Sequence, residues 1–331
     1  MQQGYSSNWH SRLKALGPGI LLATAAIGGS HIVASTQAGA LFGWQLAVLI
    51  LLVNVLKYPF FRFGVEYSLQ SGETLLEGYQ KQGRGYLLSF VWLNLIAAVV
   101  NTAGVLLLTA SLLQFFMPVQ LSLTLLCLLL LAVCLLILLA GQYKLLDKVS
   151  KWVMVLLTIT TVAAAVIAFN KGPTAAADFV GPSPWQLMYL GFLVALMGWM
   201  PAPIEISAIN SLWLKAKQQH TPVNKQDGLF DFNLGYWSTT ALALVFLALG
   251  ALVQYGSDQK VELAGAAYTN QFVSMYASTI GDWSKLLVAL VAFLCMFGTT
   301  LTVLDGYART INESFQLLGW QKAERKHSYN Y

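Results

Sequence analysis

The stretch "ATAAIGGSHIVASTQAGALFGW", residues 23–44, starts and ends like a membrane-spanning helix but is interrupted in its middle. Gly28 and Gly29 are followed by Ser30 and His31, at the depth where a helix crossing a bilayer is most apolar. Adjacent glycines weaken a helix because glycine loses more conformational freedom on folding than any other residue. In a membrane, the backbone groups that are freed must bond to other protein groups or to water in a cavity. We therefore expect this stretch to line a binding site.

The composition indicates a membrane protein. Of the 331 residues, 57% are hydrophobic and 10% are charged, and the mean hydropathy is +0.62, whereas soluble domains carry about 25% charged residues. The apolar residues gather in blocks of about 20, the length of an α-helix that crosses a ~30 Å hydrocarbon core. The sequence predicts an all-α polytopic membrane protein with a single domain over residues 1–331. We expect eight helices, at residues 16–41, 44–62, 86–116, 119–140, 148–169, 185–212, 232–255 and 284–308.

The basic residues predict the orientation, because cytoplasmic loops carry an excess of lysine and arginine. With a cytoplasmic amino terminus, sixteen of the 19 basic residues fall in cytoplasmic segments, Lys57 and Arg62 among them. The outer segments keep only Lys171, Lys260 and Lys285. The sequence therefore predicts an integral protein of the cell (inner) membrane with both termini in the cytoplasm. The net charge of +5 follows from this orientation, and we expect no binding of nucleic acid.

Catalytic motifs are missing from the sequence. It contains no CxxC pair, phosphate-binding loop or HExxH motif, and Cys127, Cys134 and Cys295 fall inside apolar blocks. We therefore expect neither an enzyme nor a bound cofactor.

A second apolar block is interrupted at "MGWMPAPIE", residues 197–205. Pro201 and Pro203 remove backbone donors and prevent a regular helix. Five crossings separate the starts of the two interrupted blocks, so these blocks run in opposite directions. An inverted repeat of five helices has this property, and in such transporters the substrate lies between the unwound segments near the midplane. We predict that residues 28–31 and 197–203 face each other across one cavity.

Four segments resemble the Nramp (natural resistance-associated macrophage protein) family of divalent-metal transporters. They are "LGPGILLATAAIGGSHIVASTQAGALFGW" at residues 16–44, "FGVEYSLQSGETLLEGY" at 63–79, "ALMGWMPAPIEISA" at 195–208 and "TTLTVLDGYA" at 299–308. The resemblance covers almost the whole chain in order. It implies the inverted-repeat fold of the LeuT and amino acid/polyamine/organocation (APC) type, with the first and sixth helices broken.

The resemblance also implies where a metal ion would bind. The family's first break reads Asp-Pro-Gly-Asn and its second contains Met-Pro-His, and these align with residues 28–31 and 200–202. The implied ligand positions are Gly28, His31, the Met200 sulfur and the backbone carbonyl of Met197. An imidazole and a thioether suit transition metals, so the transported ion is expected to be a divalent transition metal.

Proton coupling has other candidate residues in this chain. Two carboxylates on the family's third helix correspond to Asn101 and Gly104, which cannot carry a proton. Intramembrane carboxylates mark transport pathways, and Glu205 and Asp305 are such residues. Structural alternatives stay open: His31 as a hydrogen-bonded structural residue, Glu205 as a cap of freed amides, and Asp305 as the ion-pair partner of the arginine four residues later.

Two complete five-helix repeats need ten helices, and only three of the second five are found. Either the sequence is a truncated product or fragment, or a second polypeptide supplies the missing pair.

The sequence thus predicts transport of a divalent metal or related cation by alternating access, coupled to protons, with the ion, protons and the lipid bilayer as partners. The first alternative keeps the fold but takes a small organic, amino-acid-like solute, since fold does not fix function. The second is a membrane sensor or partner subunit that transports nothing.

Overall fold

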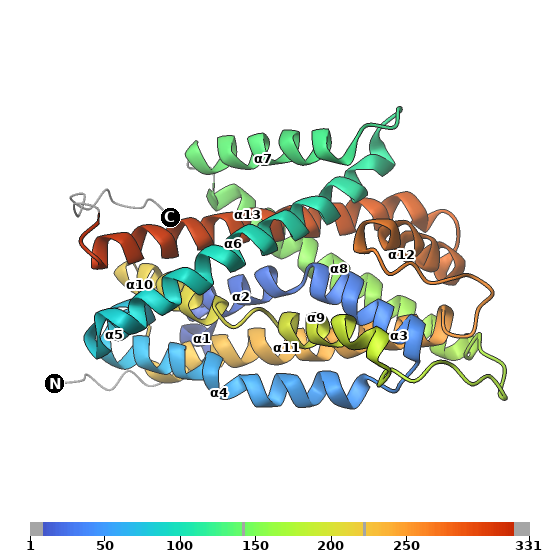
Figure 1. The fold of residues 1–331 in the computed structure, drawn as a ribbon, viewed down its shortest axis with the longest axis horizontal. Helices are drawn as coiled ribbons and strands as arrows, with labels where there is room; N and C mark the ends of the chain where they lie inside the picture. Colours follow the sequence, from blue (N-terminus) through green and yellow to red (C-terminus); the bar gives the residue numbers. More distant parts are fainter. Residues whose placement is uncertain (1–8, 141–142, 221–222, 321–331) are drawn as a thin grey trace.

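The computed structural model describes residues 9–140, 143–220 and 223–320, and every regular element in them is helical (Figure 1). The elements are α1 (Trp9–Ala15), α2 (Pro18–Ala26), the π-helical η1 (Gly29–Ser35), α3 (Thr36–Phe42), α4 (Ala47–Ser71), α5 (Leu75–Gln82), α6 (Arg84–Leu113), the 3-10 turn η2 (Gln114–Phe116), α7 (Leu123–Leu139), α8 (Tyr143–Lys171), the 3-10 turn η3 (Leu187–Tyr189), α9 (Leu190–Trp199), α10 (Ile206–His220), α11 (Lys225–Val253), α12 (Gly265–Ile280) and α13 (Ser284–Leu317).

The helices have the length and composition of membrane spans. In the described part of the chain, five helical segments are long and apolar enough to cross a bilayer: 18–42, 47–71, 84–116, 225–253 and 284–317. Three shorter apolar helices cover 123–139, 155–171 and 187–199. Large apolar side chains such as Val48, Val99 and Leu136 are exposed on the outside of the bundle, as expected where a surface contacts lipid. The protein is therefore an all-helical polytopic membrane protein.

Two of the predicted spans are interrupted helices that lie side by side. The first consists of α2, η1 and α3, and the second of α9 and α10. Figure 1 shows that they run in opposite directions. The half-helix α2 packs against α10, and η1 packs against α9. Each half of one interrupted helix is thus paired with the opposite half of the other.

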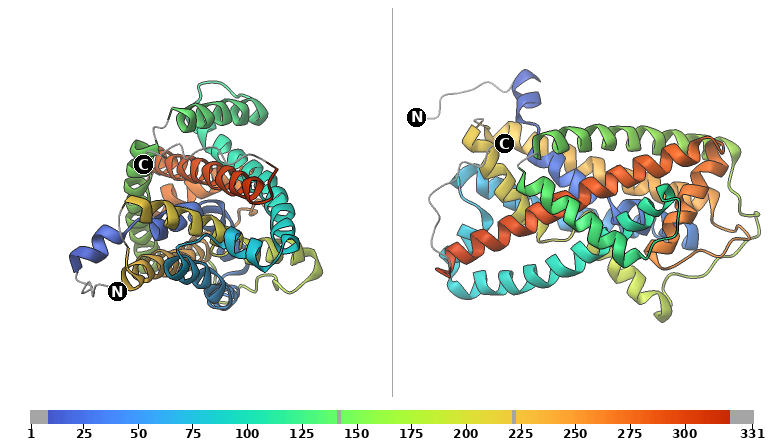
Figure 2. Two further views of the ribbon diagram at one scale, coloured as in Figure 1. Left: turned by 90° about the vertical axis from the view of Figure 1, so that its left-hand side faces the viewer. Right: turned by 90° about the horizontal axis from the view of Figure 1, so that it is seen from above.

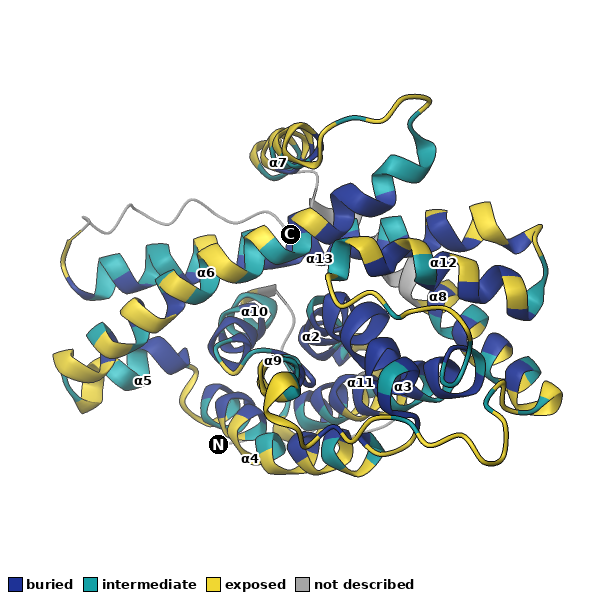
Figure 3. Ribbon diagram, turned by 45° about the vertical axis from the view of Figure 1, so that its right-hand side comes forward, coloured by how far each residue is buried: buried dark blue, intermediate teal, exposed yellow. Residues whose placement is uncertain are grey.

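Helix α11 packs along the full length of the first interrupted helix, and much of both is buried (Figure 3). Their backbones approach through glycines. A Cβ atom on Gly39 would lie 2.0 Å from the carbonyl oxygen of Leu247, and one on Gly250 would lie 2.2 Å from that of Thr36. Small residues allow this close approach of membrane helices, so these glycines fix the position of α3 against α11.

The amino-terminal end of α2 is also attached to α11. The Asp231 carboxylate accepts hydrogen bonds from the backbone nitrogens of Gly17 and Gly19, at 3.1 and 2.6 Å. A carboxylate at this end of a helix binds otherwise unpaired N–H groups and is favoured by the helix dipole. The first interrupted helix is therefore anchored to α11 at one end and packed against it at the other.

The peripheral helix α7 makes its main contacts with α6 and α13. It stands apart from the other helices in the left-hand view of Figure 2. Its leucine-rich surface is largely exposed. It plays no part in the site described below.

The helix bounds differ from the predicted ranges at several points. Helix α4 continues to Ser71, nine residues past the expected end, and α13 continues to Leu317. Helix α12 falls in a stretch for which no helix was expected. It contains many polar residues, and packing buries some of them: Tyr268 donates to Gln254, and Tyr276 bonds to Thr161.

Lys57 lies in the middle of α4, although the distribution of basic residues assigns it to a cytoplasmic segment. Contacts inside the protein compensate the charge of Lys57 there, as described next.

Candidate functional site

The first interruption lies between α2 and η1. Helix α2 ends at Ala26, and η1 begins at Gly29. The freed carbonyl of Ile27 accepts hydrogen bonds from two α13 side chains, Cys295 Sγ at 3.2 Å and Thr299 Oγ1 at 3.3 Å. Protein groups thus replace the missing helical bonds, as a membrane environment requires.

His31 is fully buried and bonds on both edges of its ring. Its Nδ1 lies 3.0 Å from the carbonyl oxygen of Ala26 and 2.7 Å from Ser30 Oγ, and its Nε2 lies 2.9 Å from the carbonyl oxygen of Thr239 on α11. The ring also packs edge-on against Phe246. In this arrangement His31 connects the first break to α11, as the structural alternative expects.

The second interruption lies between Trp199, where α9 ends, and Ile206, where α10 begins. Pro201 and Pro203 lie within it and offer no N–H group. The last carbonyls of α9 therefore need partners from elsewhere.

Lys57 of α4 supplies those partners. Its ammonium nitrogen lies 2.8 Å from the carbonyl oxygen of Met197, 2.7 Å from that of Gly198 and 3.3 Å from that of Ala202. The carbonyl end of a helix attracts a positive charge, so the ammonium is held by both hydrogen bonds and the helix dipole.

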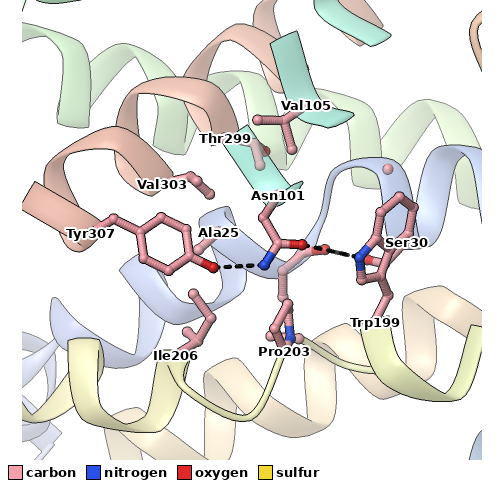
Figure 4. Close-up of a pocket in the computed structure, with 13 residues that line it drawn as sticks. Ala25, Ser30, Asn101, Val105, Trp199, Pro203, Ile206, Thr299, Val303 and Tyr307 are labelled. Atoms are coloured by element: carbon pink, nitrogen blue, oxygen red, sulfur yellow. Dashed lines mark hydrogen bonds between the residues drawn. The ribbon is translucent and has the colours of Figure 1, made fainter. Parts of the chain in front are cut away.

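The two interruptions are in contact. Ser35 Oγ lies 3.9 Å from the Met200 sulfur, and a Cβ atom on Gly29 would lie 3.4 Å from the Trp199 ring. Residues of both breaks border one central cavity of about 40 Å³, room for about one water molecule or small ion. Its lining is shown in Figure 4 and consists of Ala25, Ala26, Gly29, Ser30, Asn101, Val105, Trp199, Ala202, Pro203, Ile206, Thr299, Val303 and Tyr307.

A polar network lies at one side of this cavity. The Asn101 amide nitrogen lies 2.6 Å from the Tyr307 hydroxyl and 3.1 Å from Glu205 Oε1. The Tyr307 hydroxyl donates to the same Glu205 oxygen at 2.8 Å. The Trp199 indole donates to the Asn101 oxygen at 3.3 Å, as Figure 4 shows. The Glu205 carboxylate thus lies directly behind two residues of the cavity wall, Asn101 and Tyr307.

The four residues expected to ligate a metal are placed around the breaks, and none of them is among those that line the central cavity. His31 and Met200 are fully buried, and the Met197 side chain is partly exposed while its carbonyl contacts Lys57. A Cβ atom on Gly28 would lie 2.9 Å from the methyl group of Thr299, so a carboxylate there requires Thr299 to move.

Acidic, histidine and cysteine side chains are scattered rather than clustered. Within residues 9–140, 143–220 and 223–320, no three of them gather closely enough to hold a metal ion. Asp305 pairs with Arg309 at 2.7 Å, which agrees with the ion-pair alternative considered for it. Besides the single imidazole of His31 and the single carboxylate of Glu205, the possible ligands near the breaks are carbonyl, hydroxyl, amide and thioether groups.

Among the residues that line the cavity and that the sequence reasoning missed are Thr299, Val303 and Tyr307. They are spaced by four along α13 and so share one helical face, and Asn101 and Val105 show the same spacing on α6. This spacing was a usable signal. What the sequence did not contain was which face of α13 turns toward the breaks.

A second cavity of about 430 Å³ adjoins Trp199. Its wall is mostly apolar and includes Gln37, Tyr189, Phe192 and Leu263. Trp199 lines both cavities, so its indole ring forms part of the partition between them.

Comparisons with known proteins agree with this architecture. Residues 19–326 match the family described as "Natural resistance-associated macrophage protein-like". The "Uncharacterized protein PM0681" of Pasteurella multocida (strain Pm70) is 57% identical over 327 residues, which are 98% of this chain and 76% of that protein. Members of the matched family are transporters rather than enzymes. Because the match spans both interrupted helices and nearly all of the sequence, the chain belongs to the Nramp family of membrane metal-ion transporters.

Proposed function

We propose that this protein carries a divalent transition-metal ion across the cell (inner) membrane by alternating access, through the central cavity. One observation carries the proposal: the two interrupted helices bring their unwound segments to the same small cavity. Unwound backbone at membrane depth offers the polar groups that replace the hydration shell of an ion. Family membership supports a metal ion as the substrate.

The packing of the other helices supports an inverted repeat of the LeuT/APC type. Helix α4 packs against α11, and α6 packs against α13, and each pair runs in opposite directions in Figure 1. These are the pairs that two five-helix repeats of opposite topology would relate. In this proposal both termini are cytoplasmic.

In this proposal the implied ligands reach the ion only when the unwound segments move. Gly28, His31 and Met200 lie behind the cavity wall, and the Met197 carbonyl contacts Lys57. Movement of η1 would release the His31 ring from its two carbonyl partners and turn it toward the cavity. An imidazole and a thioether would then favour a transition metal over Mg²⁺ or Ca²⁺.

Glu205 is the residue to which we assign the coupling proton. Its carboxylate is hydrogen-bonded to Asn101 and Tyr307, which line the cavity. A metal ion in the cavity would therefore favour the release of a proton from Glu205. Asp305 is the weaker candidate because Arg309 already pairs with it.

A small organic solute is the second candidate substrate. The cavity of about 430 Å³ beside Trp199 has the size and the apolar wall typical of pockets for organic ligands. The central cavity is too small for such a molecule in the conformation described here.

Uptake into proteoliposomes tests the proposal. We expect saturable uptake of Mn²⁺ that Cd²⁺ inhibits and that a mixture of amino acids leaves unchanged. If amino acids inhibited the uptake and Cd²⁺ did not, the result would instead favour the organic solute. No uptake of either class, by protein that is folded and inserted, would favour a sensor or partner subunit.

Trp199→Ala is expected to join the two cavities, because the indole forms part of the wall between them. A cysteine introduced at Ser30 should then react faster with a membrane-impermeant thiol reagent applied from the side of the larger cavity. The matched control is Trp185→Ala, which changes an exposed tryptophan. Equal labelling rates in the two backgrounds would show that Trp199 does not separate the cavities.

A further inference from the structure

We infer that Lys57 acts as a tethered cation: its ammonium occupies the carbonyl end of α9, and a transported ion reaches these carbonyls only by displacing it. Lys57 thereby sets the affinity of the site for free cations. The role of Lys57 in transport rests on the proposed function. The contact of its ammonium with the carbonyls does not.

The depth of Lys57 is the first argument. It is the eleventh of the 25 residues of α4, about 15 Å along the helix axis and therefore near the middle of a ~30 Å hydrocarbon core. Its neighbours Leu56 and Phe60 are exposed apolar residues. Charged residues at this depth are costly and are kept where they serve a pathway.

The ligands of the ammonium are the second argument. Its nitrogen contacts three backbone carbonyls, those of Met197, Gly198 and Ala202, at 2.7–3.3 Å. A ring of carbonyl oxygens is a cation site of the kind that selective channels and transporters use for free ions. Glu205 adds an attractive negative charge nearby. The ammonium thus has the surroundings of a bound ion.

Competition follows from charge. If a divalent ion bound the Met197 carbonyl, it and the Lys57 ammonium would lie beside the same oxygen. Their mutual repulsion there costs several kcal/mol. The two cations therefore exclude each other from this position. Either the side chain moves away when the ion binds, or the ion is held by other groups.

Lys171 provides a matched comparison within the same chain. Its ammonium also contacts helix-terminal carbonyls, those of Thr279 at 2.7 Å and Ser278 at 3.4 Å. These carbonyls belong to the end of α12 and lie away from both interruptions. Replacing Lys171 removes the same kind of bond without opening the proposed ion position.

The experiment compares Lys57→Met with Lys171→Met in the full chain, purified in detergent, and measures the melting temperature against MnCl₂ and against methylammonium chloride. We expect Lys57→Met to melt lower than the parent and to be restored by methylammonium, which supplies the missing cation. Mn²⁺ should bind the Lys57→Met protein at least about tenfold more tightly than the parent, because the competing charge is gone. Lys171→Met should respond to neither ion more than the parent does.

A second variant covers the case in which Lys57→Met does not fold. Lys57→Gln keeps a hydrogen-bond donor but removes the charge, so Mn²⁺ should again bind it more tightly than the parent. If neither folded variant gains affinity for Mn²⁺ or methylammonium, or if Lys171→Met gains as much, Lys57 only satisfies carbonyls and the inference is wrong. Methylammonium rescue does not require metal transport, so it would persist even if the uptake experiment failed.

Discussion

Glu205→Gln is expected to lower metal uptake by roughly a hundredfold, because a few kcal/mol of attraction between a carboxylate and a divalent ion is lost. Glutamine keeps the length of the side chain and can still accept from the Tyr307 hydroxyl and from Asn101. The folded yield and the melting temperature should therefore stay close to those of the parent. The measurement is initial Mn²⁺ uptake into proteoliposomes at equal protein incorporation.

Glu262→Gln is the control, since Glu262 is an exposed residue of the loop between α11 and α12. It should leave uptake unchanged. The size of the effect also separates the two candidate substrates, because a neutral solute would lose far less than a divalent ion when this carboxylate is neutralised. If Glu205→Gln took up Mn²⁺ at the parental rate, the Glu205 carboxylate would not be part of the transport pathway.

Gly39→Ala is expected to prevent correct packing and to destabilise the fold by about 3 kcal/mol or more. The added Cβ would lie 2.0 Å from the carbonyl oxygen of Leu247 and 2.7 Å from the nitrogen of Ala251, both backbone atoms of α11. No side-chain rotation relieves a contact between backbones, so α3 and α11 must separate. The measurement is the fraction of protein that stays monodisperse after heating in detergent.

Gly191→Ala is the matched control for this change. Gly191 lies in α9, and a Cβ atom there would meet nothing within 4 Å. Alanine in a helix is favoured over glycine by about 0.5–1 kcal/mol, so this variant should be as stable as the parent or slightly more stable. If Gly39→Ala were as stable as Gly191→Ala, the close approach of α3 to α11 would not be required for the fold.

The membrane class and the family could be predicted from the sequence because both rest on properties that are local in the chain. Blocks of about 20 apolar residues have one stable solution in lipid, a helix with all its backbone bonds satisfied internally. The two interruptions were also predictable, since a glycine pair and two closely spaced prolines disrupt a helix in any surroundings. The Nramp resemblance depended on the same segments, and the family match confirms it.

Helix α12 was missed for a reason that is also local. Tyrosine, threonine, asparagine and glutamine lower the hydropathy of residues 265–280. Only packing against other elements buries the tyrosines and threonines and gives them partners, such as Gln254 for Tyr268. A scan for apolar blocks cannot detect a helix that is buried by its neighbours.

What the sequence by itself determined is that the chain is an all-helical membrane protein, where two of its helices are interrupted, and which family it belongs to. What only the tertiary structure decided is which groups the breaks present to the cavity. His31 was read as a ligand from its position in a motif, yet its ring bonds to carbonyls of the first break and of α11. Lys57 was counted in a cytoplasmic segment from its charge, yet three carbonyls of the second break contact its ammonium. The physical reason is the same in both cases: the direction of a side chain depends on which distant backbone groups lack a hydrogen bond, and those groups are brought near only when the helices pack.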